Sequence, residues 1–226
     1  MKLTYKTTLA GVFAAGLLAL SGCSASQNYP APEEVAEQLS EKYGTAFETD
    51  GRAEPGELYV QYRLTTPDYP GSGITAWYLP EREVLYDSFL SLSLSDGIRS
   101  EMQSLVRPVL GETAEVEHKP GTLPDCFATT GDFTAVDYLT TGGSYASVTV
   151  STDAPAEEHA AHESALLEAL TQAGYSCSLR VEYYPSAGEY GQEEKLLGSF
   201  SVDTDSGEVL LTQDDFPEEE LPEDAI

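Results

Sequence analysis

The sequence predicts an α+β protein made of two small antiparallel sheets, each packed by a helix. Some segments repeat apolar residues at helical spacing, and others alternate apolar and polar residues at strand spacing. A hydrophobic content of 41% with 10% aromatic residues is too high for a disordered chain.

The first 22 residues have the parts of an export signal. Lys2 and Lys6 form a short positive region without an acidic residue, and an uncharged apolar run, Leu9–Leu20, follows. The run is about a dozen residues long, whereas a helix needs ~20 to span a bilayer. It therefore predicts a cleaved signal peptide rather than a transmembrane helix.

The run ends at Leu20-Ser21-Gly22-Cys23, which resembles the lipobox of bacterial lipoproteins. The resemblance implies cleavage by a type II signal peptidase between Gly22 and Cys23, and a diacylglycerol group on the Cys23 thiol. Membrane lipid, bound through Cys23, is then a partner, and the chain lies on the extracytoplasmic face of the cell envelope. Two acyl chains anchor a protein durably. The alternative is a secreted protein in which Cys23 is incidental.

From Cys23 onward the chain is strongly acidic. The precursor has a formal net charge of −28, and losing the two signal lysines makes it −30. Nucleic-acid binding depends on clustered Lys and Arg, so this charge argues against a nucleic-acid partner. It also excludes electrostatic adsorption to anionic lipid.

An N-terminal α+β unit is expected over residues 33–110, after a Pro-containing tether at 23–32. Val35, Leu39 and Tyr43 recur at four-residue steps, so a helix should run from Glu33 to Gly44. Expected strands and the apolar stripe of a second helix follow in this order: 58–66, 74–79, 83–87 and 96–110.

A C-terminal α+β unit is expected over residues 144–216. Residues 111–143 read as an irregular linker with one short helix near 132–139, and residues 217–226 as an acidic disordered tail. The expected elements of the unit are a strand, a long helix and three further strands, at 145–151, 155–173, 176–184, 196–202 and 208–211.

The two units suggest a tandem α-β-β-β repeat. Residues 33–89 and 155–216 share the order helix, strand, loop, strand, tight turn, strand, although residue identity is poor. Coincidence within a generic α+β chain is the alternative. The order resembles that of PepSY-type exported domains, an analogy of architecture that carries no function.

A closer resemblance is to uncharacterised lipoproteins of Firmicutes. Besides the lipobox, it rests on Glu41–Gly44 with Phe47, on Leu85–Phe89, and on two later segments, Val136–Leu139 and Ser178–Tyr184. That family implies no activity for this chain.

Cys126 and Cys177 are the two cysteines of the exported part. Outside the cytosol they can form a disulfide that closes a loop of about 50 residues and stabilises the fold by about 2–4 kcal/mol. The alternative is two unpaired buried thiols.

Two weak candidates for metal sites are present. His159 and His162 stand at i, i+3 on the long expected helix and could hold Zn²⁺ with a carboxylate, or could be two solvated histidines. The segment Asp203–Glu208 resembles the start of a calcium loop, but its Asp-Ser-Gly favours a β-hairpin turn.

Trp77 and Tyr78 are candidates for an aromatic binding surface that takes sugar rings or peptide, together with a wider set of tyrosines. Neighbours on a strand point to opposite faces, so at least one of the two should be exposed. Cross-strand packing is the alternative. The wider set is Tyr59, Tyr62, Tyr69, Tyr183, Tyr184 and Tyr190.

No nucleophile elbow, phosphate loop, dinucleotide fingerprint or His-Glu-x-x-His motif occurs in the sequence. We therefore expect a non-enzymatic, lipid-anchored module without a cofactor that binds an envelope protein or a surface polymer. The alternative is a metal-binding protein or metal-dependent enzyme that uses His159 and His162.

Overall fold

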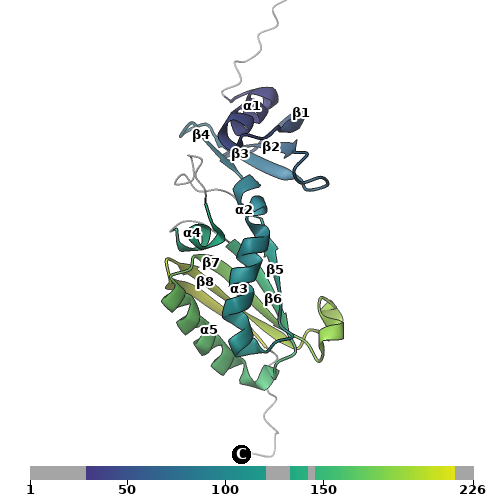
Figure 1. Cartoon of the computed structure of the whole chain (residues 1–226), viewed down its shortest axis with the longest axis vertical. Helices are drawn as coiled ribbons and strands as arrows, with labels where there is room; N and C mark the ends of the chain where they lie inside the picture. Colours follow the sequence, from purple (N-terminus) through teal and green to yellow (C-terminus); the bar gives the residue numbers. More distant parts are fainter. Residues whose placement is uncertain (1–28, 121–132, 142–145, 217–226) are drawn as a thin grey trace, which may run out of the picture.

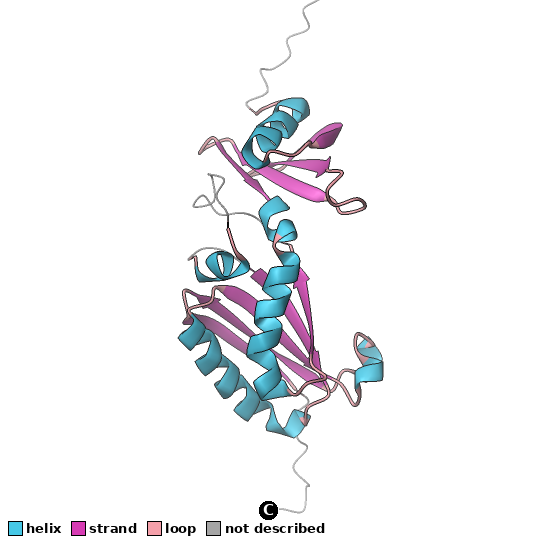
Figure 2. Ribbon diagram, in the orientation of Figure 1, coloured by secondary structure: helices cyan, strands magenta, loops and turns pink. Residues whose placement is uncertain are grey.

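The computed structural model describes residues 29–120, 133–141 and 146–216. Within them the chain is an α+β protein with a four-stranded and a five-stranded sheet, each packed by helices, as the sequence predicts (Figures 1 and 2). The signal peptide, residues 23–28, Cys126 and the acidic tail lie outside the described residues.

The N-terminal sheet is an antiparallel meander of four strands in the order β1-β2-β3-β4. Helix α1 (Pro32–Tyr43) precedes it and ends at Gly44, whose φ of 68° is left-handed. The strands are β1 (Glu48–Pro55), β2 (Val60–Thr65), β3 (Ile74–Leu79) and β4 (Val84–Asp87). Strand β1 was not predicted, because its residues carry no apolar alternation.

The C-terminal sheet has the order β5-β6-β7-β8-β9. The pair β6–β7 is parallel and the other pairs are antiparallel, so this sheet differs from the purely antiparallel one expected. A parallel pair needs a crossover, and the long helix α5 provides it. The strands are β5 (Glu115–Lys119), β6 (Ala146–Thr152), β7 (Cys177–Tyr183), β8 (Gly198–Asp205) and β9 (Glu208–Asp215).

Three helices of six to sixteen residues pack against this second sheet. Their apolar stripes meet the inward residues of the sheet in one core, for example Met102 and Leu166 against Val148 and Leu179. Pro108 lies inside the longest helix without ending it. The helices are α3 (Ser95–Leu110), α4 (Ala135–Thr140) and α5 (His159–Ala173), the last preceded by a 3₁₀ turn (Ala156–Glu158).

The boundary between the two units lies at the short helix α2 (Phe89–Ser93) and not at residue 110. Phe89 belongs to the core of the N-terminal sheet and Leu90 to the core of the C-terminal sheet. Helix α3 therefore belongs to the second unit (Figure 1). Residues 111–143 are likewise more than a linker, because β5 and α4 contribute to the same core.

Both units contain a helix followed by an antiparallel meander, which is the order expected of the repeat. The N-terminal meander has the additional strand β1, and the C-terminal meander is extended by β6 and β5 at its other edge. The last hairpin turns at Ser206 and Gly207, whose φ angles of 51° and 79° are both positive. Asp205 pairs with Glu208 across this turn, so the segment is the predicted hairpin.

Candidate functional site

The N-terminal sheet has two chemically different faces. One face carries Tyr62, Leu64 and Ile74 and packs against Val35 and Leu39 of α1. Alternate residues of a strand point to opposite faces, so the intervening residues form the face away from α1. That opposite face is partly open, and Tyr59 at its end is 42% exposed.

Four side chains of this open face form a shallow pocket of about 380 Å³: Tyr59, Trp77, Leu79 and Tyr86. The strand register brings them together, because Trp77 of β3 lies directly opposite Tyr86 of β4. On the other side Trp77 is opposite Gln61 of β2. We call these four residues the aromatic pocket.

The role of Trp77 and Tyr78 in binding stays a prediction, and the structure separates the two side chains. The two side chains do point to opposite faces, and Trp77 lines the aromatic pocket. Tyr78 instead packs against the core beneath α1. Burial, with smaller contributions from the neighbouring Tyr29 and Tyr78, raises the pKa of Tyr62 in that core to about 12. Tyr59 was in the wider aromatic set, whereas Tyr86 was missed.

The matching face of the C-terminal sheet offers an internal comparison. One row across it reads Thr149, Arg180, Ser201 and Gln213, from β6 to β9. These are the polar residues that a solvated sheet face ordinarily carries. This row carries no aromatic residue, whereas Trp77 and Tyr86 lie opposite one another on the open face of the N-terminal sheet.

Acidic residues border the aromatic pocket. Glu57 lies in the β1–β2 turn and is exposed, and Glu81 and Glu83 are exposed in the β3–β4 turn together with Arg82. Glu83 has a φ of 53°, a left-handed conformation that is uncommon for a residue other than glycine. On the same open face, Arg63 forms an ion pair with Glu54 at 3.3 Å.

His159 and His162 do not converge on a shared metal position. The ring of His159 stacks on Phe216 at 3.9 Å, and its Nδ1 lies 3.0 Å from the carbonyl oxygen of Ala156. His162 Nδ1 lies 3.0 Å from the Tyr183 hydroxyl, and burial lowers the pKa of His162. Within the described ranges no group of three or more His, Cys, Asp or Glu residues is arranged to hold a metal ion.

His118 forms a hydroxyl–imidazole cluster that the sequence did not suggest. Its Nδ1 lies 2.8 Å from Ser95 Oγ and its Nε2 lies 3.4 Å from Ser91 Oγ. The side chain is only 8% exposed, and burial lowers its pKa to about 4. Both ring nitrogens have a hydroxyl partner, so the cluster joins α2 and α3 to β5 rather than presenting a base to solvent.

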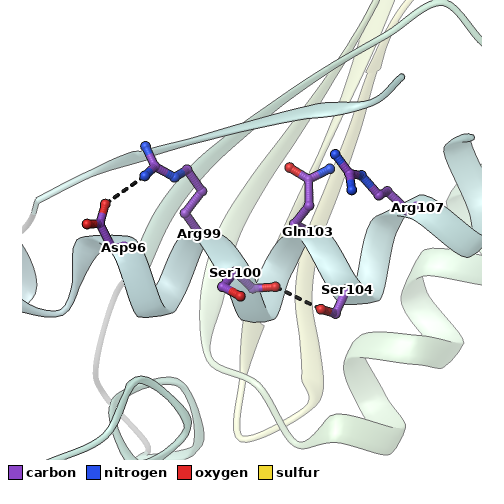
Figure 3. Close-up of a pocket in the computed structure, with 6 residues that line it drawn as sticks. All are labelled: Asp96, Arg99, Ser100, Gln103, Ser104 and Arg107. Carbon is purple, nitrogen blue, oxygen red and sulfur yellow. Dashed lines mark hydrogen bonds and ion pairs between the residues drawn. The ribbon is translucent and has the colours of Figure 1, made fainter. Parts of the chain in front are cut away.

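A second pocket lies along one polar face of α3 (Figure 3). Arg99 pairs with Asp96 at 2.6 Å, and Ser104 Oγ donates to the backbone of Ser100. Gln103 donates to the carbonyl oxygen of Ala114. The polar groups of this pocket thus already have partners within it or beside it, as on an ordinary solvated helix face.

Cys177 is completely buried, and its Sγ lies 3.7 Å from Thr204 Oγ1. Burial raises the pKa of this thiol to about 11, which makes it unreactive at neutral pH. Cys126, the partner expected for it, is outside the described residues, so their disulfide stays a prediction. Gly22 and Cys23 are outside them too.

No protein-family model and no curated protein matches the chain. Among solved structures, it is similar to the crystal structure of a DUF5037 family protein from Ruminococcus gnavus ATCC 29149. The two share 15% sequence identity at a TM-score of 0.40, over 78% of this chain and 92% of that chain. A likeness at this level carries no argument about activity or ligand. None of the described helices has the length and apolar character needed to cross a bilayer.

Proposed function

We propose that this chain is a lipid-anchored, extracytoplasmic binding protein without catalytic activity, and that the aromatic pocket is its binding surface. The observation that carries the proposal is the contrast between the two open sheet faces. The row Thr149, Arg180, Ser201 and Gln213 of the C-terminal sheet is polar, whereas Tyr59, Trp77 and Tyr86 gather on the open face of the N-terminal sheet. Tyr59 is exposed and Trp77 and Tyr86 are half-buried, and concave sites lined by aromatic side chains are common ligand sites.

The proposed extracytoplasmic location rests on the sequence alone. Leu20-Ser21-Gly22-Cys23 follows an apolar run of signal-peptide length, as in bacterial lipoproteins. A lipid at Cys23 would hold the acidic body near the membrane by acyl chains, against the electrostatic repulsion that anionic lipid exerts on it.

Binding rather than catalysis is supported by the surroundings of the histidines. His118 and His162 are both 8% exposed and bonded to hydroxyl groups. His159 is stacked on Phe216. A general base must reach the proton that it abstracts, and these contacts occupy the Nδ1 atom of each ring.

The anchor is tested by mass spectrometry of the protein from its native membrane. We expect an N-terminal peptide that begins at Cys23 and carries diacylglycerol, and release of the Cys23→Ala variant from the membrane fraction. A peptide that begins upstream of Cys23, or one without lipid, would refute the anchor.

The binding surface is tested with the mature chain carrying Cys23→Ser, added to envelope preparations of the producing bacterium. We expect saturable binding that Trp77→Ala weakens at least tenfold and that Thr149→Ala leaves unchanged. Protease and glycan-hydrolase treatment of the envelope then separate a protein partner from a surface polymer. Equal binding by both variants would reject the aromatic pocket as the surface.

A further inference from the structure

We propose that the aromatic pocket binds an alkylated ammonium group, such as the trimethylammonium head of a quaternary amine. The inference rests on the proposed function, because it names the ligand chemistry of the same pocket. It follows from the rings that line the pocket, the groups absent from its lining, and the charge around it.

Three aromatic side chains line one shallow pocket. Trp77 and Tyr86 are directly opposed on neighbouring strands, and Tyr59 and Leu79 complete the lining. A cation within about 6 Å of a ring centroid is attracted by the ring quadrupole, most strongly by Trp. Several rings around one cation are the arrangement that recognises quaternary ammonium ligands.

The lining also selects among cations. None of the four lining residues is a carboxylate, and Leu79 adds purely apolar surface. A primary ammonium is strongly hydrated and requires hydrogen-bond acceptors in place of its water. An alkylated ammonium presents methyl groups to the rings, so this lining suits it better.

Acidic residues are close in sequence to the residues of the aromatic pocket. Glu57 stands in one turn at the end of the sheet, and Glu81 and Glu83 flank Arg82 in the other. The full chain has a formal net charge of −28. A field of this sign raises the local concentration of cations and repels anionic ligands such as phosphorylated polymers.

The experiment uses the fact that Trp77 is the only tryptophan of the chain. Its fluorescence therefore reports the aromatic pocket directly. The probes are choline and its neutral isostere 3,3-dimethylbutan-1-ol, titrated into the mature chain carrying Cys23→Ser at constant ionic strength. We expect a saturable fluorescence change with choline at an affinity at least tenfold above that of the isostere.

Three variants locate the effect. Tyr59→Ala keeps the tryptophan and should weaken choline binding at least threefold, whereas Thr149→Ala, on the polar face of the other sheet, should leave it unchanged. Trp77→Ala, followed by calorimetry, should abolish choline binding. Circular dichroism spectra that match the parent show that each variant is folded.

Equal affinity for choline and the isostere would overturn the inference, because the pocket would then select shape and not charge. Stronger binding of a neutral oligosaccharide or of lysine ethyl ester than of choline would overturn it as well. If choline does not bind but Trp77→Ala still loses envelope binding, the ligand class is wrong and the proposed function stands. If the envelope assay also shows no difference, both proposals fail.

Discussion

Lys42 Nζ donates to the buried carboxylate of Asp87 over 2.9 Å. The same carboxylate accepts bonds from the Tyr43 hydroxyl at 2.9 Å and from the Phe89 amide at 2.9 Å. Asp87 is the last residue of β4, so these bonds fasten the end of α1 to the end of the N-terminal sheet at the start of α2. Burial and the charge of Asp87 raise the pKa of the Tyr43 phenol.

Replacing Asp87 should destabilise the N-terminal unit strongly. Because Asp87→Ala leaves a partly buried lysine and a phenol without their acceptor, we expect a loss of about 3–5 kcal/mol. Urea unfolding followed by Trp77 fluorescence measures it. The matched control is Glu54→Ala, which removes an exposed ion pair and should cost less than about 1 kcal/mol. Similar losses for the two variants would contradict the assignment.

His118 should make the C-terminal unit less stable in acid. Burial lowers its pKa to about 4, below the value of about 6.5 in the unfolded chain. Between pH 4 and 6.5 the unfolded state therefore binds more protons than the folded state. The contribution of neutral His118 to the free energy of unfolding is complete above pH 6.5 and is lost as the pH falls toward 4. The free energy of unfolding should drop by about 1 kcal/mol or more between pH 7 and 5 relative to a His118→Gln variant. Parallel pH profiles for the two proteins would show that His118 does not titrate as stated.

Gly207 is expected to tolerate no side chain. Its φ is 79°, and a Cβ atom there would lie 2.9 Å from the carbonyl oxygen of Thr171 at the end of α5. Gly207→Ala should therefore cost about 1–3 kcal/mol, measured by thermal unfolding. Gly188→Ala is the control, because no atom lies within 4 Å of the added Cβ. A neutral Gly207→Ala would mean that the hairpin does not approach the helix so closely.

The Cys177 thiol should resist modification in the folded protein. With a pKa of about 11, only about one thiol in a thousand is ionised at pH 8. In a mature chain carrying Cys23→Ser and Cys126→Ser, a thiol-specific chromogenic reagent should react only after denaturant is added. Rapid labelling of the native variant would place Cys177 outside the core.

The sequence predicts the helices and strands whose apolar residues recur at a regular spacing within one segment. Leu39 of α1, Met102 of α3 and Leu166 of α5 belong to apolar stripes that reach the core. The pleat alone also predicts that Trp77 and Tyr78 face opposite ways. These features need no knowledge of distant partners.

Other features depend on partners far along the chain. Strand β5 carries only two inward side chains, Val116 and His118, and pairs with β6 across residues 120–145. The stripe of α3 could be buried in either unit, and the sequence does not say which. Tyr86 joins the aromatic pocket through the β3–β4 register, which the turn at 80–83 sets.

The two units can fold at different times, because their strands pair over different sequence separations. Every strand of the N-terminal sheet pairs with its neighbour in sequence, so this unit can form as soon as residue 89 has emerged. The C-terminal sheet contains β5 as well as β8 and β9, which follow α5 in the chain. The core that buries α3 includes Val202 of β8, so it cannot be complete until β8 has formed. While the chain is being synthesised, the first unit can be complete before the apolar stripe of α3 is covered, so the second unit is the part that depends on protection from aggregation.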